Sequence, residues 1–384
     1  MDQLEEVVIA DERWERLLEL TGNAAATCYQ CGTCTAVCPW GLVRQEPLSV
    51  RLLVRKAQLG IPDQDGQLWL CTHCAQCEAH CPRGVNVGQV IDGLRQLIWE
   101  QNQAPFGLPT MLWSLYWNNN PWSQPPSQRS LWAEGLGLPR FDPEQHEILL
   151  YAGCTASYDR RAQKIARAVV KILQAAGVTV GYLAEEEPCC GEPARSVGHT
   201  PFFHELAERA ANTFERNGVA HLVTISPHCY DVFRNHYPRR DPNFHPLHYT
   251  QYLANLVEEG RLQFSGQVDQ RITYQDPCYL GRYNNEYQAA RHTLGAMPGA
   301  ELVEMEPSAE ESLCCGGGGG RMWLETEAGQ RFGDLRVQQA NQCGAKILAT
   351  ACPFCLACLE DSVKASRMTE IRVMDIAELA LQAL

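Results

Sequence analysis

The sequence predicts an α+β chain of several domains, with a helical N-terminal domain followed by two repeated α/β domains that each contain a small parallel sheet. Two identical four-cysteine runs flanked by helix-like stretches predict the first domain. An apolar strand and amphipathic helix pattern that recurs after about 125 residues predicts the other two. The chain has 384 residues, which is enough for two or three domains.

Cysteine is the unusual feature of an otherwise ordinary globular composition. Hydrophobic residues make up 45% of the chain, and its formal charge of −13 argues against a nucleic-acid-binding surface. There are 19 cysteines, mostly in tight clusters, which indicates metal or redox chemistry more than structural disulfides. Buried thiols acting as small hydrophobes would explain Cys343 but not the clusters.

The N-terminus shows no sign of a targeting segment. Its first twenty residues are acidic and amphipathic, without a basic start or an apolar run, so we expect no signal peptide. No stretch of 18 apolar residues exists, so no membrane span is expected. These observations predict a cytoplasmic protein, or one held at the periphery of a membrane by a partner.

The two N-terminal cysteine runs match the pattern that binds [4Fe–4S] cubanes. They read Cys28-x2-Cys31-x2-Cys34-x3-Cys38-Pro39 and Cys71-x2-Cys74-x2-Cys77-x3-Cys81-Pro82. In two-cluster ferredoxins the fourth cysteine of each run ligates the other cluster. We therefore assign one cubane to Cys28, Cys31, Cys34 and Cys81, and the second to Cys71, Cys74, Cys77 and Cys38. Structural zinc is the alternative, which two identical four-cysteine runs disfavour. We expect His73 and His80 to lie at the surface of the second run.

Helical stretches surround these runs. Residues 46–60 read as a helix ended by Gly60 and Pro62, and residues 85–102 place apolar side chains at helical spacing. Residues 1–102 are therefore predicted to form an α-helical two-cluster ferredoxin-like domain. Neighbouring clusters of this kind suit stepwise electron transfer.

Residues 103–145 are predicted to be a linker rich in proline and tryptophan. Seven prolines interrupt regular structure there, and four tryptophans lie among them: Trp113, Trp117, Trp122 and Trp132. The stretch around Trp113 reads as an amphipathic helix that docks on a partner or a membrane surface. The alternative, which we favour, is that the tryptophans pack between the domains of the chain itself.

The remainder of the chain is an internal repeat, predicted to form domains at 146–268 and 269–384. In each half an apolar strand, a loop with a cysteine and an amphipathic helix follow one another, around Cys154 in the first half and Cys278 in the second. Cysteines fall in the loops after the strands, where parallel α/β sheets place their sites.

The cysteine spacings of the two halves agree closely. The second half reads Cys278-x35-Cys314-Cys315-x36-Cys352-x2-Cys355, and the first reads Cys154-x34-Cys189-Cys190-x35-Ser226-x2-Cys229. Five thiols are thus expected to converge in the second half, and four thiols with Ser226 in the first.

This doubled pattern, with its two Cys-Cys-Gly triplets, resembles the CCG domains of the catalytic B subunit of heterodisulfide reductase. The N-terminal domain resembles the C subunit of that enzyme, so the chain as a whole resembles a fused D-type subunit. The stretches "CCGEPAR" and "CCGGGGGRMW" also resemble D-type iron–sulfur oxidoreductases that accompany electron-transferring flavoproteins. The resemblance covers nearly all of the chain except the tryptophan-rich linker.

The resemblance implies a noncubane [4Fe–4S] cluster in the second CCG domain. Its ligands, which would also be the catalytic residues, are Cys278, Cys314, Cys315, Cys352 and Cys355. Gly316, Gly317 and Gly318 would let backbone N–H groups approach the sulfur atoms, and such hydrogen bonds tune cluster potentials. Cys358 exceeds the family pattern; a spare ligand, a redox thiol and a packed residue are its three interpretations.

Ser226 departs from the family pattern, because a serine oxygen is a poorer iron ligand than a thiolate. The first site, formed by Cys154, Cys189, Cys190 and Cys229, is therefore expected to hold an altered cluster, a four-cysteine cubane, another metal or nothing. His228 is either a substitute ligand or, as we favour, an ordinary loop histidine.

Two functions follow from this interpretation. The favoured one is an electron-transfer subunit of a heterodisulfide-reductase-like complex in anaerobic metabolism. It would relay electrons between a flavoprotein, ferredoxin or quinone-linked membrane partner and a reductase, through two cubanes and the noncubane cluster. The alternative is a catalytic thiol/disulfide reductase subunit that acts at the noncubane cluster. A metal-storage or zinc-structural protein is disfavoured by the cluster-type spacings.

Overall fold

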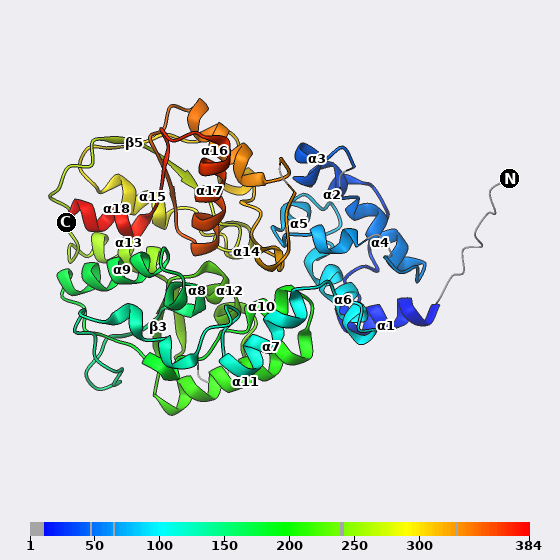
Figure 1. Cartoon of the computed structure of the whole chain (residues 1–384), viewed down its shortest axis with the longest axis horizontal. Coiled ribbons are helices and arrows are strands. Elements are labelled where there is room, and N and C mark those ends of the chain that lie inside the picture. The colour runs from blue at the N-terminus through cyan, green and yellow to red at the C-terminus, as the bar shows by residue number, and fades with distance from the viewer. Residues whose placement is uncertain (1–10, 47, 64–65, 239–241, 328) are drawn as a thin grey trace.

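The computed structural model describes residues 11–46, 48–63, 66–238, 242–327 and 329–384. It confirms the predicted α+β multidomain fold, with a helical N-terminal part and two four-stranded parallel sheets (Figure 1). The first ten residues, which bear on the expectation about a signal peptide, lie outside the described residues. Within the described part of the chain, no helix combines the length and apolar character needed to cross a membrane.

The described residues of the N-terminal domain form three longer α-helices and three single-turn α-helices. They are α1 (Asp11–Thr21), α2 (Thr33–Ala36), α3 (Trp40–Val43), α4 (Val50–Gln58), α5 (Gln76–Ala79) and α6 (Val87–Glu100). The two expected helices are present and begin where a side chain caps them. Ser49 accepts a hydrogen bond from the Leu52 N–H at the start of α4, and Asn86 accepts one from the Gln89 N–H at the start of α6.

The stretch predicted as a linker contains a helix, α7 (Leu108–Asn118), that packs on the rest of the molecule. Leu108, Met111, Leu112 and Leu115 are buried along one side of it. The favoured prediction about the tryptophans is correct for Trp122, whose ring lies against those of Trp323 and Phe354 in the second half; Trp132 is buried against Tyr182 of the first half. The prediction is wrong for Trp113 and Trp117, which are 61% and 70% exposed.

The first sheet follows this stretch and has the strand order β2-β1-β3-β4, all parallel. Its elements are β1 (Ile148–Tyr151), α8 (Gly153–Tyr158), α9 (Gln163–Ala175), β2 (Val180–Gly181), α10 (Glu192–Ser196), α11 (Thr200–Arg216), β3 (His221–Thr224), α12 (Pro227–Asn235), β4 (His245–His248) and α13 (Tyr249–Glu258). All four residues of β1 are buried, as expected of an apolar strand covered by helices on both faces.

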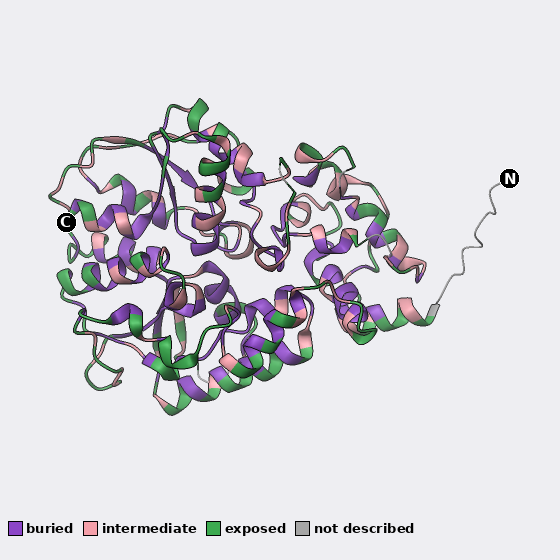
Figure 2. Cartoon of the chain, viewed as in Figure 1, coloured by how far each residue is buried: buried purple, intermediate pink, exposed green. Residues whose placement is uncertain are grey.

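The second sheet has the equivalent order, β6-β5-β7-β8, and confirms the internal repeat. Its elements are β5 (Gln270–Gln275), α14 (Gly281–Asn284), α15 (Ala289–Gly295), β6 (Ala300–Leu302), α16 (Phe332–Gln342), β7 (Ile347–Thr350), α17 (Pro353–Ser366), β8 (Arg372–Asp375) and α18 (Ile376–Ala383). Buried residues fill the centre of each half (Figure 2).

The two halves pack on each other through equivalent helices. The helix α9 of the first half contacts α18 of the second, and α13 of the first contacts α15 of the second. Because α9 is equivalent to α15 and α13 to α18, the two contacts are equivalent. Tyr249 at the start of α13 donates a hydrogen bond of 2.6 Å to Asp375, which caps α18. The segments that follow the central strands β3 and β7 also meet, because His228 after β3 hydrogen-bonds to Cys352 after β7.

Candidate iron–sulfur sites

The two N-terminal cysteine runs meet where α2 contacts α5. Cys38 of the first run lies among cysteines of the second. Burial, together with the nearby thiols of Cys74 and Cys71, raises the pKa of Cys38 to about 12. Cys34 lies near Cys28 of its own run. Burial raises the pKa of Cys34, and the charge of Cys28 raises it further. The structure therefore brings Cys38 into the second run, as the crossed assignment requires.

Hydrogen-bond donors approach the sulfur atoms of this domain. Gln30 Nε2 lies 3.6 Å from Cys28 Sγ, and the Val85 N–H donates to Cys81 Sγ at 3.3 Å. Such donors stabilise thiolate charge.

The five predicted thiols of the second CCG domain form one hydrogen-bonded group, in which Cys278 is half-buried and the other four are buried. Cys278 contacts Cys314, Cys314 contacts Cys315, and Cys315 contacts Cys355, with 3.3 Å between the last two sulfur atoms. Cys352 completes the group by its contact with Cys355. These residues come from the ends of β5 and β7 and from the loop before α16, so three separate segments supply the thiols.

The glycine run after Cys315 has two roles in the structure. The Gly316 N–H donates to Cys314 Sγ at 3.3 Å, which is a direct N–H···S contact. Gly318 and Gly319 instead face the N-terminal domain, where a Cβ atom would lie 2.3 Å from the carbonyl oxygens of Thr72 and Cys71 respectively. Only glycine permits this approach between two backbones.

This backbone contact places the second CCG site beside the second cubane loop. The thiol of Cys74 hydrogen-bonds to that of Cys314, and this contact is the main reason, with burial, that the Cys74 pKa lies well above its usual value. Thr72 Oγ1 lies 3.7 Å from Cys314 Sγ. Cysteines predicted to ligate two different clusters are therefore in contact.

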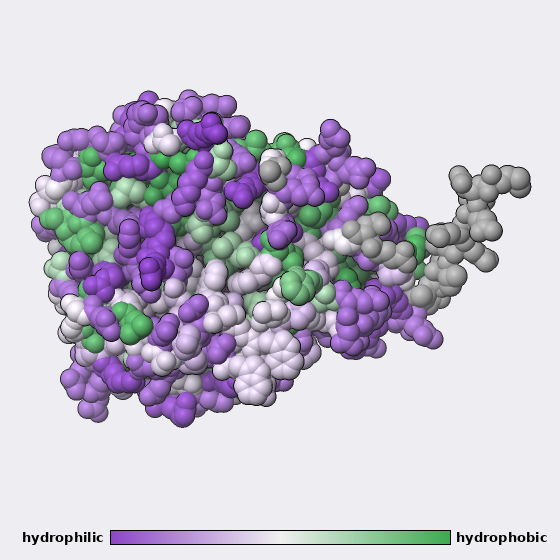
Figure 3. All heavy atoms as spheres, in the orientation of Figure 1, coloured by the Kyte–Doolittle hydropathy of each residue, from purple (hydrophilic) through white to green (hydrophobic). Residues whose placement is uncertain are grey.

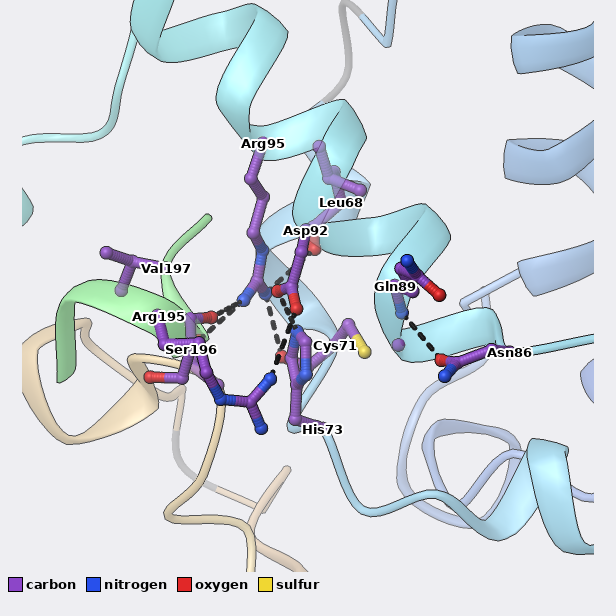
Figure 4. Close-up of polar contacts among 12 residues, drawn as sticks. Leu68, Cys71, His73, Asn86, Gln89, Asp92, Arg95, Arg195, Ser196 and Val197 are labelled. Carbon is purple, nitrogen blue, oxygen red and sulfur yellow. Dashed lines mark hydrogen bonds and ion pairs between the residues drawn. The ribbon is translucent and has the colours of Figure 1, made fainter. Parts of the chain in front are cut away.

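Two arginines hold this junction together, the buried Arg95 and the half-buried Arg282. Arg95 of α6 donates to the carbonyl oxygens of Cys71 at 2.8 Å and Gly319 at 3.1 Å, and also to that of Ser196 (Figure 4). It thereby links the N-terminal domain to both CCG domains. Arg282 of α14 donates to the Cys74 carbonyl at 2.6 Å, and it also binds the carbonyls of Glu310 and Ser312.

The histidines of the second run correct an expectation. His73 is 2% exposed, so the prediction that it lies at the surface is wrong; its Nε2 lies 3.1 Å from Asp92 Oδ1. Figure 4 shows Asp92 between His73 and Arg195, which reaches across from the first CCG domain. His80 is half-buried and pairs with Glu311 at 3.1 Å.

The four thiols of the first CCG domain also form a buried chain. Cys154 contacts Cys189, Cys189 contacts Cys190, and Cys190 contacts Cys229. The hydroxyl of Ser226 hydrogen-bonds to Cys229, at the place where the second half has its fifth thiol.

A buried ion pair adjoins the first site. Arg129 lies 3.3 Å from Cys154 Sγ and 2.9 Å from a carboxylate oxygen of Glu187. Glu187 also accepts hydrogen bonds from the N–H groups of Ala152 and Gly153. Arg129 belongs to the stretch predicted as a linker, so this stretch completes the first site.

His228 lies between the two CCG sites. It hydrogen-bonds to Cys352 of the second site, and its Nδ1 lies 3.2 Å from Glu192. Burial alone would lower the pKa of His228, but Glu192 and Cys352 outweigh it and raise that pKa to about 10. Its ring stacks on Tyr279 with the centroids 4.0 Å apart. His228 therefore joins the two halves and is not an ordinary loop histidine.

Sequence reasoning did not find the arginines of these sites. Arg95 and Arg129 lie far in sequence from the cysteines that they contact. Arg282 is only four residues beyond Cys278 but reaches the Cys74 carbonyl of the N-terminal domain, and no motif marks any of the three. A signal existed for Arg95 alone, since a charged residue interrupts the apolar pattern of the predicted helix at 85–102.

The thiol groups fit multi-iron clusters. Neighbouring buried sulfur atoms, N–H···S contacts and nearby guanidinium groups are what an anionic cluster requires. In the described part of the chain, no three His, Cys, Asp or Glu side chains converge on one point as the ligands of a single metal ion would.

Comparison with known families agrees with this distribution of cysteines. Residues 148–234 and 272–360 each match the cysteine-rich domain CCG, and residues 27–85 match the 4Fe-4S dicluster domain. Both CCG matches begin at or near the first strand of a sheet and run past the last cysteine of that half.

Three relatives illustrate the similarity. The chain is 36% identical to the EtfAB:quinone oxidoreductase of Syntrophomonas wolfei and 34% identical to a probable membrane-anchored ferredoxin of Chromohalobacter salexigens, covering 83% and 98% of this chain. It spans only 46% and 61% of the length of those two proteins. It is 30% identical to the D subunit of the dihydromethanophenazine:CoB–CoM heterodisulfide reductase of Methanosarcina barkeri, over 82% of this chain and 77% of the relative.

Proposed function

The chain belongs to the family of iron–sulfur oxidoreductases that includes the D subunit of heterodisulfide reductase, and on this premise we propose that it relays electrons between a redox partner and a reductase. The two cubanes would be held by the crossed sets of N-terminal cysteines, and a noncubane cluster by the five thiols of the second CCG domain. When bound, these groups supply one-electron transfer.

One observation carries the proposal: the contact between Cys74 and Cys314. A relay needs its electron carriers close together, and here residues of two predicted ligand sets touch. The approach of Gly318 and Gly319 to the carbonyls of Thr72 and Cys71 fixes this contact. Arg282 strengthens it, because it holds the Cys74 carbonyl and the loop before Cys314 at once.

The first CCG site extends the relay. Its four thiols are buried and adjacent, and Arg129 compensates part of their negative charge. We propose that they hold a further iron–sulfur cluster despite Ser226. The rings of His228, Tyr279 and Phe354 lie between the two CCG sites, with those of His228 and Phe354 4.8 Å apart.

The proposed partners are redox subunits of a larger complex. A relative carries the name EtfAB:quinone oxidoreductase, and this chain spans 46% of its length. We propose an electron-transferring flavoprotein as the donor to the N-terminal domain and a quinone-linked membrane subunit or a reductase as the acceptor. Electrons would then enter at the cubanes and leave through the CCG domains.

Replacing one glycine at the contact between the two loops tests the relay. The substitution Gly318→Ala places a Cβ against the Thr72 carbonyl and must move the two loops apart. Gly295→Ala is the matched control, since its Cβ meets no atom within 4 Å. In an anaerobic stopped-flow experiment with dithionite, we expect Gly318→Ala to slow the final phase of bleaching by at least about tenfold, because small misplacements of reacting groups are costly. Equal rates in the two variants would contradict the proposal.

The alternative is catalytic disulfide reduction at the second CCG site, and the position of His228 favours it. Its protonated imidazole hydrogen-bonds to Cys352, and this contact helps to lower the Cys352 pKa against the effect of burial. Ser226→Cys would complete the first site. If this variant reduces a disulfide faster than the unmodified protein does, with a low-potential electron donor, the function is disulfide reduction by the paired sites. If disulfide reduction stays negligible while the clusters are still reduced at the normal rate, the result supports the relay.

A further inference from the structure

Among the cysteines of the chain, Cys31 of the first predicted cubane is the most accessible to solvent. It is the only exposed cysteine of the 19, all of which are described; the others are buried or half-buried. Tyr29, which is 60% exposed, contacts the Cys31 thiol and lies near Cys81, a predicted ligand of the same cluster. Electron exchange between two molecules requires close approach of their redox centres, so we expect it where a predicted cluster ligand reaches the surface.

Arginines of α4 border the loop of the first cysteine run. A Cβ on Gly32 would lie 3.6 Å from Arg51 Cδ, and Gln58 Nε2 donates to the Cys28 carbonyl at 3.2 Å. Arg55 is four residues beyond Arg51 and three before Gln58, and residues at these spacings share one side of a helix. Both arginines are exposed, so positive charge lines this edge of the loop. Figure 1 shows α4 on the side of the N-terminal domain away from the two CCG domains.

These cations have no acidic partner in the structure. Arg51, Arg55 and Arg83 are exposed, and among the described residues no carboxylate oxygen lies within 4 Å of their guanidinium groups. Arg83 lies near Tyr29, so it adds its charge close to the exposed thiol. Residues 22–45 contain no Asp or Glu, although the formal charge of the whole chain is −13. Cys31 therefore lies in a positive patch of an otherwise acidic protein.

Aromatic and aliphatic surface accompanies this charge. Leu52 is 47% exposed and is three residues before Arg55 on α4. We name this group the Cys31 surface; its residues are Tyr29, Cys31, Arg51, Leu52, Arg55 and Arg83. Tyr and Arg are the residue types that protein interfaces favour at their centres. Nucleic acid and anionic lipid also attract cations, but neither exchanges electrons with a cluster.

We propose that the Cys31 surface is the docking site of an acidic redox protein that exchanges single electrons with the first cubane. The three arginines would attract carboxylates around the redox centre of the partner, while Tyr29 and Leu52 pack against its surface. One electron passes in each encounter, so one centre is oxidised and the other reduced, and no bond forms or breaks. The proposal rests on the proposed function only for the path of the electron beyond the first cubane; the docking does not depend on it.

Docking is tested by isothermal titration calorimetry of the oxidised, cluster-loaded protein with oxidised plant-type [2Fe–2S] ferredoxin, an acidic protein that serves as the probe. At low ionic strength we expect Arg51→Gln with Arg55→Gln to raise the Kd at least about tenfold, and the difference to shrink at high salt. Arg51→Lys with Arg55→Lys should keep most of the affinity. The matched control is Arg160→Gln with Lys171→Gln, which removes two exposed cations of the first CCG domain and should leave the Kd unchanged.

Two results of the titration would overturn the proposal. One is the absence of measurable binding to the unmodified protein at low ionic strength. The other is an equal rise of the Kd in the control variant, since the total charge of the chain and not the Cys31 surface would then govern binding.

Stopped-flow reduction separates docking from the relay. Reduced ferredoxin should transfer electrons more slowly to Arg51→Gln with Arg55→Gln, by a factor similar to the change in Kd. Reduced methyl viologen, a small cation that needs no docking surface, should reduce this variant as fast as the unmodified protein. Equal slowing with both donors would show that the arginines act on the cluster and would overturn the proposal. Gly318→Ala should leave the Kd unchanged, so failure of the relay and failure of docking are distinguishable.

Discussion

The two CCG domains share one topology but surround their thiols with different charges. In the first, the cation beside the site, Arg129, is neutralised by Glu187. In the second, Arg282 binds only carbonyl oxygens, and among the described residues no carboxylate lies within 4 Å of it. An uncompensated cation favours the more negative, reduced state of whatever its site holds. We therefore expect the second site to be the better electron acceptor.

The two domains also have different neighbours. The second site contacts the cubane loop through Cys74, whereas the first is completed by Asn119 and Arg129 of the stretch predicted as a linker. The stretch beside the first domain also carries the exposed aromatic residues of α7, and pale, weakly polar side chains gather near α7 and α11 in Figure 3. Under the proposed function, the second half would be where electrons enter the CCG domains and the first half where they leave.

The largest effect is expected from removing one thiol of each half. Cys315→Ala and Cys190→Ala should each lower the iron content by about four atoms per chain, because each site would lose one cluster. Cys343→Ala is the control and should lose none. Iron and acid-labile sulfide analysis makes the measurement. Full iron in Cys190→Ala would show that the halves differ in occupancy as well as in charge.

Next in size is the loss of the buried ion pair of the first half. Arg129→Ala leaves Glu187 buried without its cation, and we expect a loss of about 3–5 kcal/mol in the free energy of unfolding. The pair-removing variant Arg129→Met with Glu187→Gln should recover most of it. Thermal unfolding under anaerobic conditions provides the comparison. Equal losses in the single and double variants would contradict the view that the unpaired charge of Glu187 causes the loss.

The charge difference should appear in reduction potentials. Arg282→Gln is expected to lower the potential of the second site by roughly 50–100 mV, and Glu187→Gln to raise that of the first, since one unit charge changes in each. Spectroelectrochemical titration measures both values. A shift of the same sign in the two variants would contradict the electrostatic account.

The smallest effect concerns pH and two equivalent helix caps. Burial lowers the pKa of His248, the cap of α13, to about 3, and burial raises the pKa of Asp375, the cap of α18, to about 8. His248 binds its proton less tightly in the folded state, so its contribution to stability falls as the pH drops below about 6.5.

Asp375 behaves in the opposite way. It binds its proton more tightly in the folded state, so its contribution falls as the pH rises from about 4 through 8. We expect Asp375→Asn to flatten the alkaline side of a plot of unfolding midpoint against pH, and His248→Gln to flatten the acidic side. If Asp375→Asn instead flattened the acidic side and His248→Gln the alkaline side, these two caps would not be the titrating groups.

The sequence was sufficient for features that repeat or have fixed spacing. The two sheets and the convergence of Cys278, Cys314 and Cys315 follow from local pattern, since strand periodicity and cysteine spacing are properties of short segments. The crossed assignment of the N-terminal cysteines stays a prediction. The pattern at residues 109–119 also predicted a helix correctly, although our favoured burial of Trp113 and Trp117 was wrong.

Contacts between domains were beyond the sequence. Whether Gly318 faces a sulfur atom or the Thr72 carbonyl depends on how two domains dock, and nothing within the glycine run specifies that. Arg95 and Arg129 reach their sites across long sequence separations for the same reason. The sequence related His228 only to the cysteines of the first half, because its contact with Cys352 of the second half depends on how the halves pack.

The central claim is that the second CCG site adjoins the second cubane through Cys74 and Cys314. EPR spectroscopy of the protein during stepwise reduction tests it most directly, because two neighbouring paramagnetic centres split or broaden each other's signals. We predict that the cubane signal changes its line shape and relaxation with the redox state of the second CCG site, and that Gly318→Ala weakens this interaction. Cubane signals that stay the same in every redox state of that site would contradict the account.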